Sequence, residues 1–422
     1  PFWAPTQLAQ FRHFWVAAMA LASALAAICP PGFDDFCDHE MITLMTSDGH
    51  AVRCLEGLLR ARCPKGPQAA AGEELSVVLP LLQWIYAARV QERPVGDFDL
   101  EHFARIVRLA ESWGLRDVAE LQERLMAKRS RARGAGSLPE DLLTAYRNNE
   151  LNGRFSFRCP SLSNKDTKAD EEEMEVPLEG GLTALLQVRS EYFGAMLSGA
   201  WAESCPTKDE KTVVTMYWPR DQMARLLEFI HGGTFVAKVE DLRTAVDCAA
   251  FFGVPSLLHH VREWIANNLK VSTAPTLWRF VETEPLLKMQ DIDGCEDAED
   301  VEAACFEFHL EHFSELAGIK VWESFGGDDE TNDASEEEPP LHTLSIELFH
   351  RLLMSGLVRL PTRQLICVVE RFARAKCSDP SCTEAFAKLF TSLMPPAVIF
   401  NRDCRSALLQ FNDVPARTMI TV

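Results

Sequence analysis

The sequence predicts an α+β fold, with small sheets and helical clusters in the first two-thirds of the chain and helices alone in the last third. Three observations support this class. The run Thr212–Met216 is rich in β-branched residues and lies between amphipathic helix patterns. A second series of strand and helix patterns precedes it, within residues 37–128. From Thr276 onward, apolar residues recur at three- and four-residue spacing, which is typical of helices.

The segment 154–269 carries the clearest pattern. Thr212–Met216 is expected to be a strand, and another is expected near Val176. Leu185–Leu197 predicts one amphipathic helix that ends near Gly199. Two further helices are expected after the strand, at Gln222–His231 and Leu242–Phe252.

The segment 37–128 shows a shorter version of the same order. Met41–Met45 and Ala51–Cys54 predict two strands, and Ser47–His50 between them is typical of a hairpin turn. Apolar periodicity then predicts four helices, the third of which ends at Gly114. Their ranges are Leu55–Arg62, Leu79–Tyr86, His102–Trp113 and Val118–Met126.

Internal similarity joins these two segments. Leu81–Tyr86 matches Leu226–His231 in residue type at every position, and two other pairs match in the same order. Collinear matches indicate a tandem duplication, with copies at 37–128 and 154–269. The region 129–153 is then a linker, and its basic run is a solvated segment or, alternatively, a nuclear-localisation or nucleic-acid signal. The other matching pairs are Leu109–Leu115 with Cys248–Val254 and Leu58–Cys63 with Leu185–Ser190.

Residues 270–422 are expected to form an all-helical domain. Gly326–Glu338 carries seven acidic residues and no aromatic one, and Pro339-Pro340 ends it, so 324–340 is expected to be a disordered insert within this domain. The predicted helices cover Leu277–Val281, Val301–Leu316, Ile346–Met354, Thr362–Ala375 and Thr383–Leu393.

Residues 1–36 are expected to contain an apolar helix. The run Phe14–Cys29 follows Arg12 and His13 and is too short for a comfortable membrane span. Two interpretations remain open: an Ala-rich helix that packs on a neighbour, or the core of a signal peptide preceding a secreted or anchored protein.

Composition limits the classes of partner. The chain has 422 residues, with 42 Lys and Arg against 62 Asp and Glu, and a net charge of −20. This charge opposes nonspecific binding to nucleic acid or to an anionic membrane. The 13 Cys are odd in number and form no framework, so a reducing cytoplasmic or nuclear location is expected. Cys248, Cys305 and Cys367 lie in apolar helix patterns and are expected to pack as small buried residues.

Motifs for catalysis or cofactor binding are missing from the sequence. It contains no Gly-x-Ser-x-Gly, P-loop, Gly-x-Gly-x-x-Gly or His-Glu-x-x-His pattern, so neither enzymatic activity nor a cofactor is expected. Cys305, His309 and His312 share one helix face at a spacing that a metal could use. One helix supplies at most three ligands, however, and we expect these residues to belong to the core and its boundary, with no metal bound.

The segments Leu186–Phe193, Leu226–Thr234 and Cys248–Leu257 occur in an order that resembles the BTB (POZ) domain, and the second copy begins with Arg154–Pro160. The resemblance implies two BTB domains, of which the first is degenerate. Leu277–Phe313 and Leu344–Arg374 resemble the helical BACK domain that commonly follows BTB. The whole arrangement is most similar to the ankyrin-repeat-and-BTB (BPOZ-like) adaptors, although residues 1–36 show no ankyrin signature.

The resemblance implies a protein-interaction adaptor that joins a cullin-3 scaffold to an unknown protein substrate for ubiquitination, and that self-associates through BTB. In that family a hydrophobic-x-Glu triplet contacts the cullin, and the matching residues are Trp201, Ala202 and Glu203, close to Tyr192 and Phe193. An exposed aromatic residue beside a carboxylate can anchor and orient a partner. Alternatively, Trp201 packs on its own domain, and the chain is an oligomeric scaffold that binds no cullin.

The chain departs from the family pattern in two places. The His-Lys pair that usually precedes the Leu-x-x-Arg-Ser helix is replaced by Leu55-Glu56 and by Leu182-Thr183. The first copy is also short between Cys63 and Leu79, and it lacks a counterpart of 192–203. Cullin binding is therefore expected from the second copy.

Overall fold

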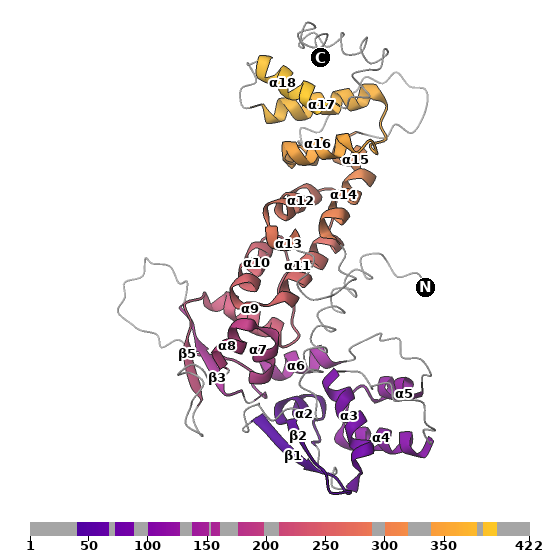
Figure 1. Cartoon of the computed structure of the whole chain (residues 1–422), viewed down its shortest axis with the longest axis vertical. Coiled ribbons are helices and arrows are strands. Elements are labelled where there is room, and N and C mark those ends of the chain that lie inside the picture. The colour runs from indigo at the N-terminus through magenta and orange to yellow at the C-terminus, as the bar shows by residue number, and fades with distance from the viewer. Residues whose placement is uncertain are drawn as a thin grey trace, which may run out of the picture. The chain divides into compact units, whose positions relative to one another are not determined.

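The computed structural model describes residues 40–66, 72–87, 100–126, 137–151, 153–160, 176–197, 211–288, 300–319, 339–377 and 383–394 (Figure 1). These residues belong to two compact units, 1–261 and 262–422. The first unit combines helices with small sheets, and the described part of the second is helical. The mixed α+β class is therefore confirmed. The expected N-terminal helix within 1–36 lies outside the described residues, as does the acidic insert except for its last two residues.

The first half of the first unit begins with the predicted hairpin. Strands β1 (Met41–Met45) and β2 (Ala51–Leu55) pair antiparallel, with Met41 opposite Leu55. Gly49 has φ +85°, which this tight turn requires and glycine adopts without strain. The four predicted helices follow as α2 (Glu56–Arg62), α3 (Leu75–Ala87), α4 (Leu100–Trp113) and α5 (Val118–Met126).

The second half of this unit has a three-stranded sheet. Strand β3 (Phe155–Arg158) lies between β4 (Leu178–Glu179), to which it is antiparallel, and β5 (Thr212–Thr215), to which it is parallel. The expected strands near Val176 and at Thr212–Met216 are thus confirmed. The helices are α7 (Thr183–Arg189), α8 (Glu191–Leu197), α9 (Arg220–Ile230), α10 (Asp241–Phe252) and α11 (Pro255–Asn267).

The prediction of one helix over Leu185–Leu197 was wrong, because the chain breaks at Ser190. Ser190 has an extended backbone (φ −137°, ψ 121°). Its hydroxyl accepts a hydrogen bond from Phe193 N (3.2 Å) and donates one to the carbonyl oxygen of Phe252 (2.6 Å). A serine that satisfies the first turn of a helix favours a helix start at that point. Apolar spacing does not reveal such a break, because the apolar face continues through it.

A helix that the sequence did not predict, α6 (Leu138–Arg147), lies within the expected linker 129–153. Leu138, Leu142 and Ala145 are buried at helical spacing, and the helix contacts α2 and α9 (Figure 1). Residues 137–151 are therefore a packed part of the unit. The basic run Lys128–Gly134 lies outside the described residues.

Each half of the unit contains a hydrogen bond from a main-chain N–H to a buried side chain, and the two bonds lie at corresponding positions. Leu55 N donates to the hydroxyl of Tyr86 (2.7 Å), and Leu182 N donates to Nε2 of His231 (3.0 Å). Both leucines directly precede a seven-residue helix, α2 or α7, and have nearly the same extended backbone. Tyr86 and His231 each end one of the two matching hexapeptides of the sequence.

A buried arginine ends each of these two helices. Arg62 Nη2 donates to Asp117 (2.9 Å), while Arg189 Nη2 donates to Ser256 (3.3 Å). Asp117 and Ser256 each come three residues after a glycine with positive φ, Gly114 or Gly253. The correspondence of the two halves thus extends from their sequences to their buried polar contacts.

The two halves also contact each other at the first turns of α2 and α7. The buried carboxylate of Glu40 accepts hydrogen bonds from the backbone N (3.2 Å) and the hydroxyl of Thr183, and burial raises its pKa. A Cβ on Gly57 would lie 2.7 Å from the carbonyl oxygen of Leu151 and 3.0 Å from Leu182 Cδ2. The chain can approach this closely because Gly57 has no side chain.

Gly57→Leu is expected to reduce the free energy of unfolding of the first unit by about 1–3 kcal/mol, because overpacking forces backbone shifts. This loss outweighs the gain in helix propensity, at most about 1 kcal/mol. Thermal unfolding measured by calorimetry checks it. Gly72→Leu is the matched control, since a Cβ there meets nothing within 4 Å. Equal stability of the two variants would contradict a tight contact at Gly57.

The second unit packs its helices around aromatic side chains. Phe349 of α16 (Ile346–Met354) stacks on Phe372 of α17 (Thr362–Lys376), with ring centroids 3.8 Å apart. The expected single helix Val301–Leu316 was wrong, because it ends at His312 as α14 and resumes as α15. No helix in the described ranges is long and apolar enough to cross a membrane. The other elements are α12 (Ala274–Thr283), α13 (Pro285–Lys288), α14 (Val301–Glu311), α15 (Phe313–Leu316), the 3-10 helix η4 (Pro340–Thr343) and α18 (Thr383–Leu393).

Candidate functional site

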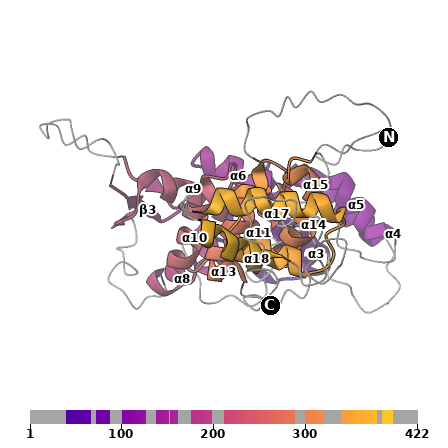
Figure 2. The same ribbon diagram turned by 90° about the horizontal axis from the view of Figure 1, so that it is seen from above.

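Helix α8, which leads toward the segment with Trp201 and Glu203, is firmly held against α10 (Figure 2). The Ser190 hydroxyl donates to the carbonyl oxygen of Phe252, and Glu191 N donates to the carbonyl oxygen of Gly253 (3.0 Å). A Cβ on Gly253 would lie 2.8 Å from Cβ of Glu191. The α8–α10 pair is therefore a rigid base for the residues that α8 presents.

The two described site residues of the sequence prediction have different environments. Phe193 is fully buried and packs 5.3 Å from Phe157 of the sheet, so it belongs to the core. Tyr192 is half-buried, and its ring lies 5.5 Å from that of Phe251. Trp201 and Glu203 lie outside the described residues. Tyr192 is thus the described member of the predicted set that reaches the surface.

An aromatic surface surrounds Tyr192. It consists of Tyr192, Trp218 and Phe251, which come from α8, from the loop after β5 and from α10, and Tyr217 directly precedes Trp218 in the chain. Tyr217 is 94% exposed and Phe251 is 51% exposed, while the Trp218 and Phe251 rings lie 4.7 Å apart. Exposed aromatic clusters of this kind commonly mark protein-binding sites.

Sequence reasoning did not include Tyr217, Trp218 or Phe251 in the site. Each follows an apolar run and could equally be buried, so spacing alone does not distinguish them from core residues. The adjacent aromatic pairs Tyr217-Trp218 and Phe251-Phe252 were a usable signal. Successive side chains of an extended segment point to opposite faces, so of the pair Tyr217-Trp218 one side chain is expected at the surface.

The buried frame beneath this surface centres on Arg189. Its Nη1 donates to the carbonyl oxygens of Phe229 (2.9 Å) and Ile230 (2.7 Å), and burial lowers its pKa to about 10. The guanidinium also lies 4.9 Å from the Phe229 ring. Arg189 thereby links the end of α7 to the end of α9, immediately before the residues that start α8.

Comparison with known protein families identifies this part of the chain. The family model of the BTB/POZ domain matches residues 182–269. Residues 182–269 form a BTB/POZ domain. The match runs from the residue before α7 to the end of α11, and so it includes α8, α10 and the aromatic surface. No curated protein matches the chain.

The BTB domain gives the chain a role in protein interaction, since BTB domains are interaction modules and are generally not enzymes. Its described surface fits that role.

Burial raises the pKa of the Cys248 thiol to about 12, so this cysteine is neutral at physiological pH and packs as an apolar residue in α10.

The candidate metal ligands Cys305, His309 and His312 have surroundings unlike those of metal ligands. His309 is buried, its ring is tilted against that of Trp278 with centroids 4.6 Å apart, and its Nδ1 lies 2.7 Å from the carbonyl oxygen of Cys305. Burial lowers the His309 pKa to about 4 and raises that of Cys305 to about 12. His312 instead lies beside Glu315 at 3.4 Å. Within the described ranges, no cluster of three or more His, Cys, Asp or Glu could hold a metal ion.

Proposed function

We propose that the chain is a substrate adaptor whose BTB domain recruits a cullin-3 type scaffold. The observation that carries this proposal is the aromatic surface of Tyr192, Trp218 and Phe251, in which Phe251 is exposed on α10 and α10 packs against α8. Trp201 and Glu203 follow the end of α8 by four and six residues in the sequence. Together they would supply aromatic anchors and one orienting carboxylate, which is the composition of an interface hot spot.

We also propose that residues 37–128 are a second, shortened BTB domain. The matching hydrogen bonds of Tyr86 and His231, and the matching buried Arg62 and Arg189, support common ancestry of the two halves. In the described residues, α2 is followed by α3, with no counterpart of α8 and β5 between them. The first half therefore lacks the elements that present the aromatic surface, and the second half is the proposed cullin-binding copy.

The second unit would then be the BACK-like domain of the adaptor. Its described residues are helical throughout, as a BACK domain requires. The proposed partners are one cullin-3 type scaffold and a protein substrate, in the cytoplasm or nucleus.

The combined change Trp201→Ala and Glu203→Ala is expected to weaken binding of the cullin-3 N-terminal region by at least about 2 kcal/mol, or about 30-fold. Phe251→Ala is expected to weaken it in the same direction with little loss of folding, since half of that side chain is exposed. Isothermal titration of the purified chain measures both. The matched control is Met126→Ala with Glu123→Ala, an exposed apolar residue and an exposed carboxylate of α5.

Two results would contradict the proposal. Unchanged binding in the double variant would exclude the site, and no binding by the wild-type chain would exclude the function. Sedimentation with and without the cullin fragment tests the alternative, a scaffold that self-associates through BTB. A scaffold would sediment as an oligomer and form no heavier complex with the cullin fragment.

A further inference from the structure

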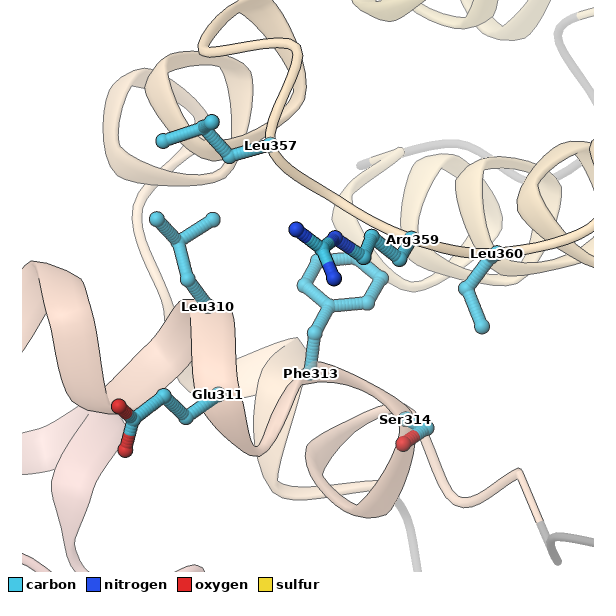
Figure 3. A pocket seen from close by; sticks show the side chains of 7 residues that line it. All are labelled: Leu310, Glu311, Phe313, Ser314, Leu357, Arg359 and Leu360. Carbon is cyan, nitrogen blue, oxygen red and sulfur yellow. The ribbon is translucent and has the colours of Figure 1, made fainter.

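The second unit contains a pocket of about 460 Å³, between α14–α15 and the segment that joins α16 to α17 (Figure 3). Leu310 and Phe313 line it from the first side, and Leu357 and Leu360 line it from the second. The volume is in the range of pockets that hold small ligands or large side chains. These four side chains give the pocket an apolar part that suits a hydrocarbon or aromatic group, beside the polar side chains of Glu311, Ser314 and Arg359.

The segment Leu357–Pro361 joins α16 to α17 and is neither helix nor strand (Figure 3). Gly356, with φ +68°, ends α16, and Leu357 N then donates to the Ser355 hydroxyl (3.1 Å). Pro361 (φ −55°, ψ 139°) directly precedes α17. Leu357 is 59% exposed even though it lines the pocket. The end of α16 and the start of α17 therefore position the leucines on this side of the pocket.

The main chain of this segment is available for pairing. Among the described residues, none accepts a hydrogen bond from the backbone N of Val358, Arg359 or Leu360. Unpaired N–H and C=O groups on an extended segment are a template on which another extended chain can add as a strand. A peptide could therefore bind here by main-chain hydrogen bonds as well as by its side chains.

One positively charged side chain, that of Arg359, also lines the pocket. The guanidinium of Arg359 points toward the space between Leu310 and Leu357, whereas the carboxylate of Glu311 points away from it (Figure 3). In the described part of the chain, no carboxylate lies within ion-pair distance of Arg359. A guanidinium beside an apolar pocket is suited to a carboxylate of the partner, which it can bind in a bidentate manner.

We propose that this pocket binds an extended acidic peptide segment of a substrate protein. A bulky apolar side chain would enter between Leu310 and Leu357, and an Asp or Glu two positions away would pair with Arg359. Residues i and i+2 of an extended chain face the same side, so one strand can place both groups. This assignment rests on the proposed adaptor function, to which it adds the class of substrate.

A peptide array tests the assignment with the full chain. The peptides have the form Gly-Ser-X-Ser-Z-Ser-Gly, with X as Leu, Phe, Met or Ser and Z as Glu, Asp, Gln or Lys. Binding is expected to require an apolar X and an acidic Z. Arg359→Glu is expected to reduce binding of the acidic peptides at least tenfold and to transfer the preference to Z as Lys. Leu357→Ser is expected to reduce the preference for an apolar X.

Arg363→Glu is the matched control, because Arg363 is exposed at the start of α17 and does not line the pocket. No signal, a signal that is equal across the array, or an acidic preference that survives Arg359→Glu would overturn the assignment. The result is independent of cullin binding. Peptide binding without cullin binding would therefore reject the proposed scaffold and keep this site, and the reverse result would reject only the site.

Discussion

Replacing Arg189 with methionine is expected to lower the free energy of unfolding of the first unit by about 1–3 kcal/mol. Arg189 donates to the carbonyl oxygens of Phe229 and Ile230, and both lie in the buried interior. Methionine fills much of the space but donates no hydrogen bond. Gly232 N also donates to the Phe229 carbonyl oxygen (3.2 Å), so the Ile230 carbonyl is the one that loses its donor. A buried carbonyl left without a donor costs about 1–3 kcal/mol.

Denaturant unfolding, followed by tryptophan fluorescence, measures this loss. Arg158→Met is the control, since Arg158 is exposed at the end of β3, and a surface change of this kind alters stability by about 0.5 kcal/mol or less. The loss at Arg189 also separates α7 from α9 beneath the aromatic surface, so cullin binding is expected to fall with stability. A small effect, equal to that of Arg158→Met, would show that the buried carbonyls do not depend on this guanidinium.

Acidification below pH 6.5 is expected to destabilise the BTB domain through His231. Its Nδ1 lies 2.8 Å from the carbonyl oxygen of Leu227, and its Nε2 accepts from Leu182 N. The neutral ring, with its proton on Nδ1, satisfies both contacts, and a second proton on Nε2 would break the bond to Leu182. Burial lowers the His231 pKa from its ordinary 6.5 to about 4.

The sign of this effect follows from proton binding. Between pH 6.5 and 4 the unfolded state binds a proton at this histidine and the folded state does not, so stability falls as pH falls. The lowering of the His231 pKa from 6.5 to about 4 corresponds to a loss of about 3 kcal/mol of folding stability at pH 4. The stabilisation is fully present above pH 6.5.

NMR titration of the His231 ring nitrogens checks the pKa and the tautomer directly. The unfolding midpoint between pH 7 and pH 4.5 checks the linkage, and His231→Gln is expected to flatten this part of the pH profile. His350→Gln should leave the profile unchanged, because His350 is exposed on α16. A ring that titrates near 6.5 would contradict the buried hydrogen-bond arrangement.

Apolar periodicity predicted most helices well where one face is buried and the ends carry clear signals. The bounds of α5, α16 and α18 agree with the sequence prediction, and so does the glycine that ends α4. The matching hexapeptides Leu81–Tyr86 and Leu226–His231 also correctly indicated equivalent positions. Their last residues make the same kind of bond to the start of α2 and of α7.

The features that sequence reasoning missed depend on contacts between distant residues. Ser190 breaks the predicted helix because its hydroxyl reaches the carbonyl oxygen of Phe252, 62 positions away in the chain. Helix α6 was taken as part of a linker because a basic, glycine-bearing run precedes it, and the structure buries its Asp141 beside Arg62 and Arg116. Phe251 is exposed because Phe252 takes the place in the core. The helix break at Ser190, the packing of α6 and the exposure of Phe251 are determined by tertiary contacts and not by the local sequence pattern.

The contact of Glu40 and Gly57 with α7 has a consequence for stoichiometry. It joins the first turns of two corresponding helices, so similar surfaces of the two halves meet within one polypeptide, much as they do across the axis of a twofold dimer. A symmetric dimer of identical subunits presents two copies of every binding surface. In the proposed adaptor, this chain would present one aromatic surface for its two halves, which is one scaffold site per polypeptide.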